Sequence, residues 1–178
     1  VLDDGLLEGK SNNYMVGIKV QDNKAGLAVA DASTGEFRIT EIELKDGFSG
    51  VEDEINRLNP IECLIPASMV SGELASFLRK RFNSMALNAL DDWSFGKDEA
   101  ESVLKKHFKV ASLSGFGSDG MDAALGAAGA LLSYICDTQR ASLLHVSSMS
   151  LYSTLDCMVL DSASQRNLEL AQRLSDNS

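Results

Sequence analysis

A glycine-rich run in the second half of the chain is the first candidate for chemistry. Gly115-Phe-Gly117-Ser-Asp-Gly120 has the G-x-G-x-x-G spacing that brings a helix N-terminus against the pyrophosphate of a dinucleotide. Such a site also needs a buried strand immediately upstream, and residues 109–114 are half polar and follow an expected helix instead. The sequence contains no G-x-x-x-x-G-K-[ST] loop for ATP. We therefore interpret this run as a loop and predict no cofactor site in the chain.

The residues that serve as nucleophiles and metal ligands are few and scattered. His107 and His145 are the only histidines, and neither has a cysteine or carboxylate at metal-ligand spacing. His107 falls at the edge of an apolar helical stripe, where packing is its expected role. Ser33 and Cys63 have no nearby base to activate them. We therefore predict no catalytic residue and no metal ligand.

The charge of the chain has the wrong sign for a protein that binds DNA through its phosphates. The net charge is −10, whereas neutralising phosphates requires a basic face. Arg79-Lys80-Arg81 is a local basic run, but it sits at the end of an expected helix, where cations complement the helix dipole. A DNA-binding role for this chain is therefore not expected.

Cysteine usage and hydropathy indicate a compartment. Cys63, Cys136 and Cys157 are odd in number and widely spaced, which favours free thiols in a reducing environment. The longest apolar stretch, residues 123–132, is interrupted by glycines and too short to cross a bilayer. The first residues are acidic, unlike a secretory signal. We expect a cytoplasmic protein with no membrane partner.

Residues 12–44 have the period of two that predicts β-strands. We expect three strands, one starting at Asn12, one over Leu27–Ala30 and one from Phe37 to Leu44. The turn clusters Gln21–Lys24 and Ser33–Gly35 join them, with Gly35 at a positive φ. Connections this short make neighbouring strands antiparallel.

After residue 44 helical periods alternate with short apolar runs. Ser49 and Glu52 have the spacing of a capping box at a helix start. The expected order is a helix over residues 49–58, a strand over Ile61–Ile65, a helix over Ser71–Phe82, a strand over Met85–Leu90 and a helix from Asp98 to Phe108. This alternation is typical of parallel βα units. We therefore predict an α/β fold in which three antiparallel strands and then βα units form a ribonuclease-H-like mixed sheet with flanking helices.

That architecture makes a stand-alone, metal-dependent nuclease the alternative function. Two-metal phosphodiester cleavage needs several carboxylates that converge on divalent cations, one of them in the middle of the first strand. Residues 12–21 contain no Asp or Glu. Asp22 falls in a turn, and Asp31 is expected to start the next turn by bonding nearby amides. The sequence favours a catalytically silent sheet.

Two later helices complete the expected order. The first spans residues 121–140 and is crowded with alanine and leucine, which predicts burial. The second begins near Ser162 and Gln165, which again have capping-box spacing. Its apolar stripe consists of Ala163, Leu170, Ala171 and Leu174. A helix of about twelve residues is marginal alone in water, so we expect the chain to be a piece of a longer protein.

The last segment, Met158-Val-Leu-Asp-Ser-Ala-Ser-Gln-Arg-Asn-Leu-Glu-Leu170, resembles the start of the lever in the MutS family of DNA mismatch-repair ATPases. The family usually has Arg where Gln165 stands. Further stretches agree in the same order, from about Leu6 to Leu174. They are Leu6-Leu7-Glu8 with Asn12-Asn13-Tyr14, Asp31-Ala-Ser-Thr-Gly-Glu-Phe37, Leu58-Asn59-Pro60, and Ala127-Ala-Gly-Ala-Leu-Leu-Ser-Tyr134 with Thr138-Gln139.

The resemblance implies a division into domains and a function. Residues 1–11 would be a linker, residues 12–145 the ribonuclease-H-like connector domain and residues 146–178 the truncated start of the lever. The full-length family member is expected to be a dimer that binds mismatched duplex DNA and uses ATP and Mg²⁺ through other domains. The connector would link those parts, relay conformational change and dock a MutL-like protein. The fragment itself would be a non-catalytic monomer.

The resemblance implies that this chain acts through a binding surface rather than through an active site. Asp137, Thr138, Gln139 and Arg140 form a polar tip on an otherwise apolar helix, and they are the candidate docking residues for the MutL-like partner. Trp93 and Phe95 are expected to pack inside the protein, with a partner anchor as the alternative.

Overall fold

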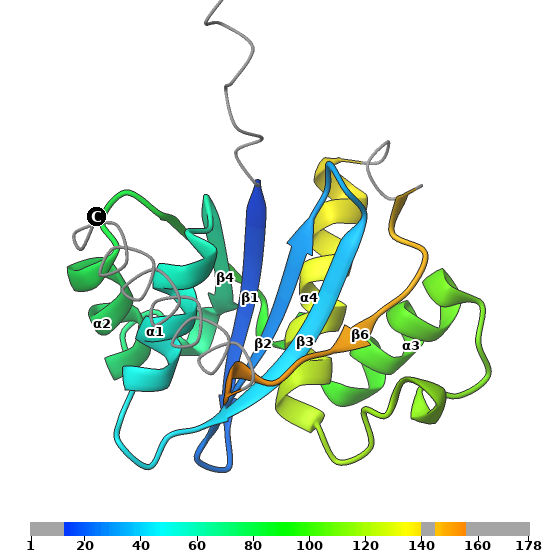
Figure 1. Cartoon of the computed structure of the whole chain (residues 1–178), viewed down its shortest axis with the longest axis horizontal. Coiled ribbons are helices and arrows are strands. Elements are labelled where there is room, and N and C mark those ends of the chain that lie inside the picture. The colour runs from blue at the N-terminus through cyan, green and yellow to red at the C-terminus, as the bar shows by residue number, and fades with distance from the viewer. Residues whose placement is uncertain (1–12, 140–144, 156–178) are drawn as a thin grey trace, which may run out of the picture.

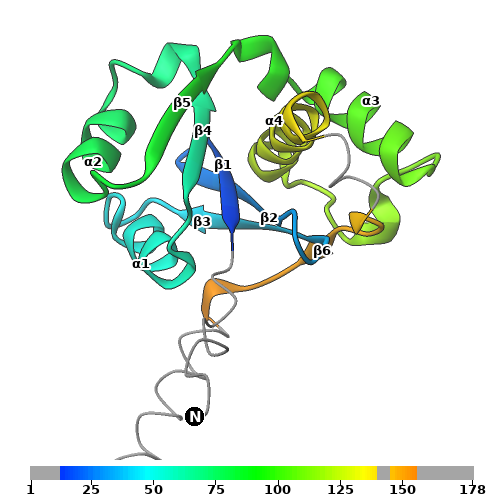
Figure 2. The same cartoon turned by 90° about the horizontal axis from the view of Figure 1, so that it is seen from above.

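The computed structural model describes residues 13–139 and 145–155. Over these residues the chain forms a six-stranded mixed sheet in the order β5-β4-β1-β2-β3-β6. Helices α1 (Ser49–Leu58) and α2 (Glu73–Arg81) cover one face, whereas α3 (Lys97–Phe108) and α4 (Asp122–Thr138) cover the other (Figures 1 and 2). The expected α/β class and mixed sheet are confirmed.

The first three strands form the predicted antiparallel meander. β1 (Tyr14–Gln21) pairs with β2 (Lys24–Asp31), which pairs with β3 (Glu36–Glu43), both antiparallel. Asp22 and Asn23 both have positive φ, 51° and 58°, as the two-residue turn of a hairpin requires. Gly35 has a φ of 78°, as expected for the second turn.

The parallel part of the sheet lies beside β1. β4 (Glu62–Pro66) runs parallel to β1, and β5 (Ala86–Leu90) runs parallel to β4. A sixth strand, β6 (Ser150–Leu151), pairs parallel to β3. The sequence analysis did not predict β6, because two residues are too few to show a period.

Three helices follow the predicted stripes, but the predicted capping box at Ser49 and Glu52 is wrong. Phe48 precedes α1 without a side-chain cap, and the Glu52 amide donates to the Phe48 carbonyl at 2.8 Å. Ser49 is therefore the first residue of the helix rather than its N-cap, although the expected bounds, residues 49–58, are confirmed. The corresponding box at Ser162 and Gln165 lies outside the described residues.

Each face of the sheet has its own hydrophobic core. The core on the α1 and α2 side includes Val51, Ile55 and Leu78, all buried. The core on the other side includes Phe37, Leu104 and Leu131, also buried. The sheet is therefore covered on both faces, as expected for a sheet with parallel strands.

Helix α4 lies unusually close to the sheet, and its small residues allow this. A Cβ added at Gly26 of β2 would lie 2.1 Å from the Ala123 carbonyl carbon, and one added at Gly129 of α4 would lie 2.4 Å from the Ala100 Cα of α3. The predicted burial of this helix is confirmed. Glycine is required at both contacts because backbone meets backbone there.

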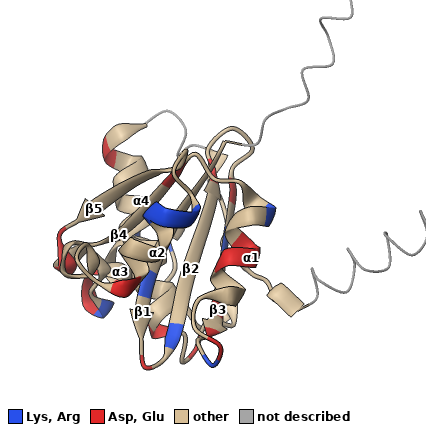
Figure 3. Cartoon of the chain, turned by 90° about the vertical axis from the view of Figure 1, so that its left-hand side faces the viewer, with Lys and Arg blue, Asp and Glu red and all other residues tan. Residues whose placement is uncertain are grey.

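The surface features agree with the sequence analysis. Arg79, Lys80 and Arg81 occupy the last turn of α2. On the side presented in Figure 3, acidic and basic residues are mixed along the ribbon and form no continuous basic face. Among the described helices, none is both long and apolar enough to span a bilayer.

Candidate functional site

The predicted docking residues lie at the C-terminal end of α4. Asp137 and Thr138 are the last exposed residues of the helix, and Gln139 follows as its exposed C-cap. Thr138 Oγ1 donates to the Tyr134 carbonyl at 2.7 Å, which satisfies one of the carbonyl groups at the helix end. Arg140 lies outside the described residues. The tip projects beside the turn that joins β2 and β3 (Figure 1).

A groove of about 220 Å³ adjoins this tip. Its lining residues are Asn13, Met15, Ala32, Ser33, Ile61 and Gln139. Ile61 is 51% exposed, so a large apolar side chain is accessible at this groove. We call Ile61, Asp137, Thr138, Gln139 and the groove between them the tip surface. It combines an apolar floor with a polar rim, as a protein-binding surface does.

Hydrogen bonds between side chains link α4 to the sheet beside the tip surface. Tyr134 of α4 donates from its hydroxyl to Glu62 Oε1 of β4 at 2.5 Å, and Asn88 of β5 donates to the same oxygen at 2.5 Å. The hydrogen bond to Glu62, together with partial burial, raises the pKa of Tyr134 to about 12. The phenol is therefore neutral near pH 7 and remains a donor.

Asp31 shapes the other wall of the groove, and its predicted role is confirmed. The carboxylate is 1% exposed and accepts from the Ser33 amide at 2.9 Å and from the Ser33 hydroxyl at 2.5 Å. These bonds fix the turn between β2 and β3. Across the described ranges, no three His, Cys, Asp or Glu side chains gather where they could hold a metal ion.

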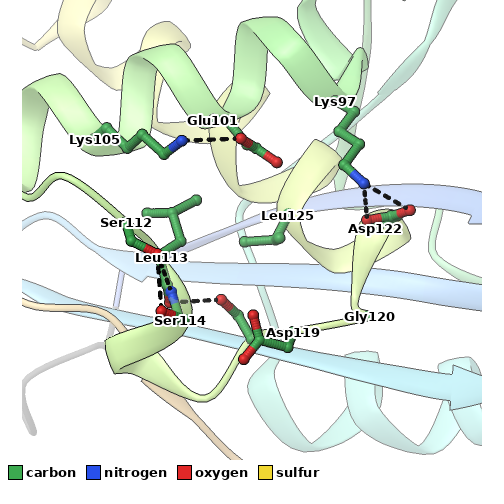
Figure 4. Close-up of a pocket in the computed structure, with 11 residues that line it drawn as sticks. Lys97, Glu101, Lys105, Ser112, Leu113, Ser114, Asp119, Gly120, Asp122 and Leu125 are labelled. Atoms are coloured by element: carbon green, nitrogen blue, oxygen red, sulfur yellow. Dashed lines mark hydrogen bonds and ion pairs between the residues drawn. The ribbon is translucent and has the colours of Figure 1, made fainter.

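The glycine-rich run forms a loop, as interpreted. Gly117 and Gly120 have φ of 75° and 77°, and the element that precedes the loop is the helix α3 rather than a strand. The loop borders a polar pocket (Figure 4). Both of its lysines are already paired, Lys97 with Asp122 at 3.2 Å and Lys105 with Glu101 at 3.0 Å.

His107 and the cysteines occupy structural positions. The half-buried His107 makes a hydrogen bond from Nε2 to the Val146 carbonyl at 2.7 Å, in keeping with its expected packing role. Cys63 is buried and Cys136 half-buried, both as free thiols. Cys157 lies outside the described residues.

The predicted packing of Trp93 is wrong, whereas that of Phe95 is confirmed. Phe95 is 1% exposed, but Trp93 is 64% exposed and donates from Nε1 to Asp91 at 3.3 Å. The two residues lie on the short 3₁₀ helix Asp92–Phe95, where side chains two apart point in different directions.

Sequence reasoning found the polar tip but missed the groove. The groove combines the start of β1, the β2–β3 turn, the residue before β4 and the end of α4. No spacing in the sequence links these positions. The one local signal was Ile61, an apolar residue directly after Asn59-Pro60, which the period alone assigned to a strand.

Comparison with known proteins places this fold in a family. A family model described as MutS domain II matches residues 13–147. The DNA mismatch repair protein MutS of Solibacter usitatus is 38% identical over 175 residues, which cover 97% of this chain and 19% of that protein. The MutS of Dehalococcoides mccartyi strain 195 is 36% identical over 178 residues, or 100% of this chain and 20% of that protein.

A third relative gives a similar match. The MutS of Methanococcoides burtonii is 35% identical over 173 residues, or 97% of this chain and 19% of that protein. The chain thus spans about a fifth of the length of the curated relatives that it matches. The match of domain II over residues 13–147, together with these identities across nearly the whole chain, means that this chain belongs to the MutS family.

Proposed function

We propose that this chain is the connector part of a DNA mismatch-repair protein of the MutS type. In this role it links a mismatch-recognition part to an ATPase part, both supplied by the parent protein, and relays conformational change between them. The observation that carries the proposal is the match of MutS domain II to residues 13–147, in a chain that corresponds to about a fifth of its relatives. Residues 1–11 then form a linker, residues 12–145 the connector and residues 146–178 the start of the lever.

The ribonuclease-H-like architecture is part of this proposal. It is supported by an antiparallel β1-β2-β3 meander on one side of β1 and parallel β4 and β5 on the other. This is the order of three antiparallel strands followed by βα units.

The connector acts without an active site of its own. β1 reads Tyr-Met-Val-Gly-Ile-Lys-Val-Gln and offers no carboxylate at its centre, and Asp31 is engaged in its turn. ATP, Mg²⁺ and mismatched duplex DNA then belong to other domains of the parent, which works as a dimer in the cytoplasm. Free thiols at Cys63 and Cys136 suit that reducing compartment.

The alternative, a stand-alone ribonuclease-H-like nuclease, has a direct test. The purified chain is incubated with Mg²⁺ or Mn²⁺ and labelled DNA, RNA and hybrid duplexes. We expect no cleavage above the level of a protein-free control. Cleavage that persists through purification and is lost on Asp31→Asn would refute the non-catalytic assignment.

We assign the docking of a MutL-like partner to the tip surface. Its exposed Ile61 provides an apolar anchor, and Asp137 provides charge at the rim. Buried apolar anchors contribute most of the binding energy at protein interfaces, while rim charges mainly affect association rate and salt dependence.

Substitutions in the full-length parent test this assignment. Ile61→Asp should weaken MutL capture strongly, and Asp137→Lys should weaken it mainly at low salt. Asp46→Lys, an exposed acid in the connection between β3 and α1, is the matched control for charge. Mismatch binding and ATP hydrolysis should not change in any of the three. Unchanged capture by the Ile61→Asp and Asp137→Lys proteins would remove the tip surface from the account.

A further inference from the structure

Residues 145–152, which we call the strap, include β6 and cross from one face of the sheet to the other along the outer side of β3. Val146 and Met149 are each 3% exposed and belong to the core on the α3 and α4 side. Tyr152 packs against the core on the α1 and α2 side. Figures 1 and 2 show this segment, in orange, running along the outer edge of β3. The strap therefore contacts both cores of the protein.

The first half of the strap is firmly anchored. Val146 and Met149 are buried, and the Val146 carbonyl accepts from His107 at 2.7 Å. The backbone of His145 lies so close to Gly35 that a Cβ added there would be 2.1 Å from the His145 carbonyl oxygen. Opening this half would expose two buried apolar side chains to water, which costs a large free energy because their hydrophobic burial is lost.

The second half is held by fewer contacts. Ser150 and Leu151 pair with Arg38 and Ile39, and the Tyr152 amide donates to the Ile39 carbonyl at 3.1 Å. Ser150 and Leu151 are both exposed. A two-residue edge ladder with exposed side chains contributes little by itself, so the side chain of Tyr152 decides whether this half stays in place.

Tyr152 occupies a charged cluster between β3 and α1. Its hydroxyl donates at 2.8 Å to Glu54, a carboxylate that is 3% exposed and also forms an ion pair with Arg57. The guanidinium of Arg38, which pairs with Glu36, lies 4.7 Å from the centre of the Tyr152 ring. Burial, and then the Glu54 charge, raise the pKa of Tyr152, so the phenol stays protonated near pH 7.

We propose that Tyr152 is a releasable lock and that residues 150–152 alternate between a docked and a peeled state, with the hinge at Met149. The balance is set by the hydrogen bond to Glu54 and the stacking of Arg38. Peeling leaves Val146 and Met149 buried and the β1-β2-β3 meander intact. In the parent protein, conformational change passes between the lever and this domain through the lock, and this last step rests on the proposed function.

Hydrogen exchange of the Tyr152 amide in the 178-residue chain tests the lock. Tyr152→Phe keeps the ring and removes the bond to a charged acceptor, so exchange of this amide should become about tenfold faster or more. Arg38→Met removes the stacked cation and should act in the same direction. Amides of β1 and β2, which open only with the whole domain, should exchange more slowly than the Tyr152 amide in the unaltered chain.

Tyr134→Phe is the matched control, because it removes another phenol bonded to a glutamate, on the opposite face of the sheet. It should leave exchange at residue 152 unchanged. Two results would overturn the lock: unchanged exchange at residue 152 in the Tyr152→Phe chain, or an equal acceleration at residue 152 in the Tyr134→Phe chain. The second result would show that the Tyr152 amide opens only when the whole domain unfolds.

A separate measurement on the full-length parent tests how the lock is used. Exchange of the same amide is compared with and without ATP, and a change of severalfold or more supports transmission through the strap. A lock that responds to Tyr152→Phe but not to ATP would refute transmission while leaving the connector function standing.

Discussion

Gly26 lies where the sheet and α4 come into closest contact, and Gly26→Ala tests that packing directly. The added Cβ would lie 2.1 Å from the Ala123 carbonyl carbon, 2.2 Å from the Ala124 amide nitrogen and 2.4 Å from the Ala123 carbonyl oxygen. All three are backbone atoms of the first turn of α4, so no side-chain rotation relieves the overlap. A hydrogen bond also fixes this turn, because Glu41 of β3 accepts from the Ala124 amide at 3.3 Å.

The size of the effect follows from these distances. Ordinary contact of a Cβ begins near 3.4 Å, so α4 must move by about 1.3 Å, the difference between 3.4 Å and 2.1 Å. Overpacking usually destabilises by about 1–3 kcal/mol, and displacement of a whole helix belongs at the upper end of that range. We expect a loss of about 3 kcal/mol in the free energy of unfolding. For a chain of this size, that corresponds to a fall in Tm of roughly 6–12 °C.

Thermal unfolding followed by far-UV circular dichroism, with a urea titration for the free energy, measures this loss. Gly115→Ala is the control, because nothing lies within 4 Å of a Cβ added there. It should change the stability by less than about 0.5 kcal/mol. A Gly26→Ala chain that is as stable as the Gly115→Ala chain would show that α4 does not lie against β2 as described.

Three further predictions concern single side chains. Phe95→Ala should lower the free energy of unfolding by about 3–5 kcal/mol, because Phe95 is buried. Trp93→Ala should change it by less than about 0.5 kcal/mol, because Trp93 is exposed. Equal losses in urea titrations would contradict the burial of Phe95 and the exposure of Trp93. Burial raises the pKa of the Cys63 thiol, which makes it unreactive in the native protein. Iodoacetamide labelling followed by peptide mass spectrometry should find Cys63 unmodified and the half-buried Cys136 modified slowly. Equal labelling of the two would be inconsistent with the burial of Cys63. The pKa of Tyr134 is raised to about 12, so its stabilising contribution is complete below about pH 10 and is lost as the pH rises towards 12. Between about pH 10 and pH 12 the urea midpoint should therefore fall less steeply with pH in the Tyr134→Phe chain than in the unaltered chain. Midpoints that fall in parallel in the two chains would argue against the bond from Tyr134 to Glu62.

The repeating parts of the fold could be predicted from the sequence. Alternation of period two placed β1, β2 and β3, and apolar stripes placed α1, α2 and α3, because burial of one face imposes a period on each element. The small residues of α4 predicted its burial, and the close contacts at Gly26 and Gly129 give the physical reason.

Features made by separate segments could not be predicted in this way. β6 contains two residues, and the residue after it, Tyr152, bonds to Glu54, which lies 98 positions away in the sequence. The groove beside Ile61 likewise depends on tertiary packing. Trp93 and Phe95 were both expected to be buried, but on the short 3₁₀ helix that carries them only Phe95 faces the core.

The candidate site was found only in part. Asp137, Thr138 and Gln139 stand at an exposed helix end, as the change from apolar to polar residues predicted. Their part in docking stays a prediction. The apolar residue that completes the tip surface, Ile61, was expected inside a strand but lies directly before β4, and periodicity does not report that it remains exposed.

Replacing residues 13–147 of the full-length parent by a flexible Gly/Ser linker tests the central claim, that this domain couples two distant activities without catalysing either. The decisive measurement is the change in affinity for mismatched DNA when ATP is added. The account predicts that the altered protein still binds mismatched DNA and still hydrolyses ATP, but that ATP no longer changes the affinity. An ATP-dependent change as large as in the unaltered parent would contradict the account.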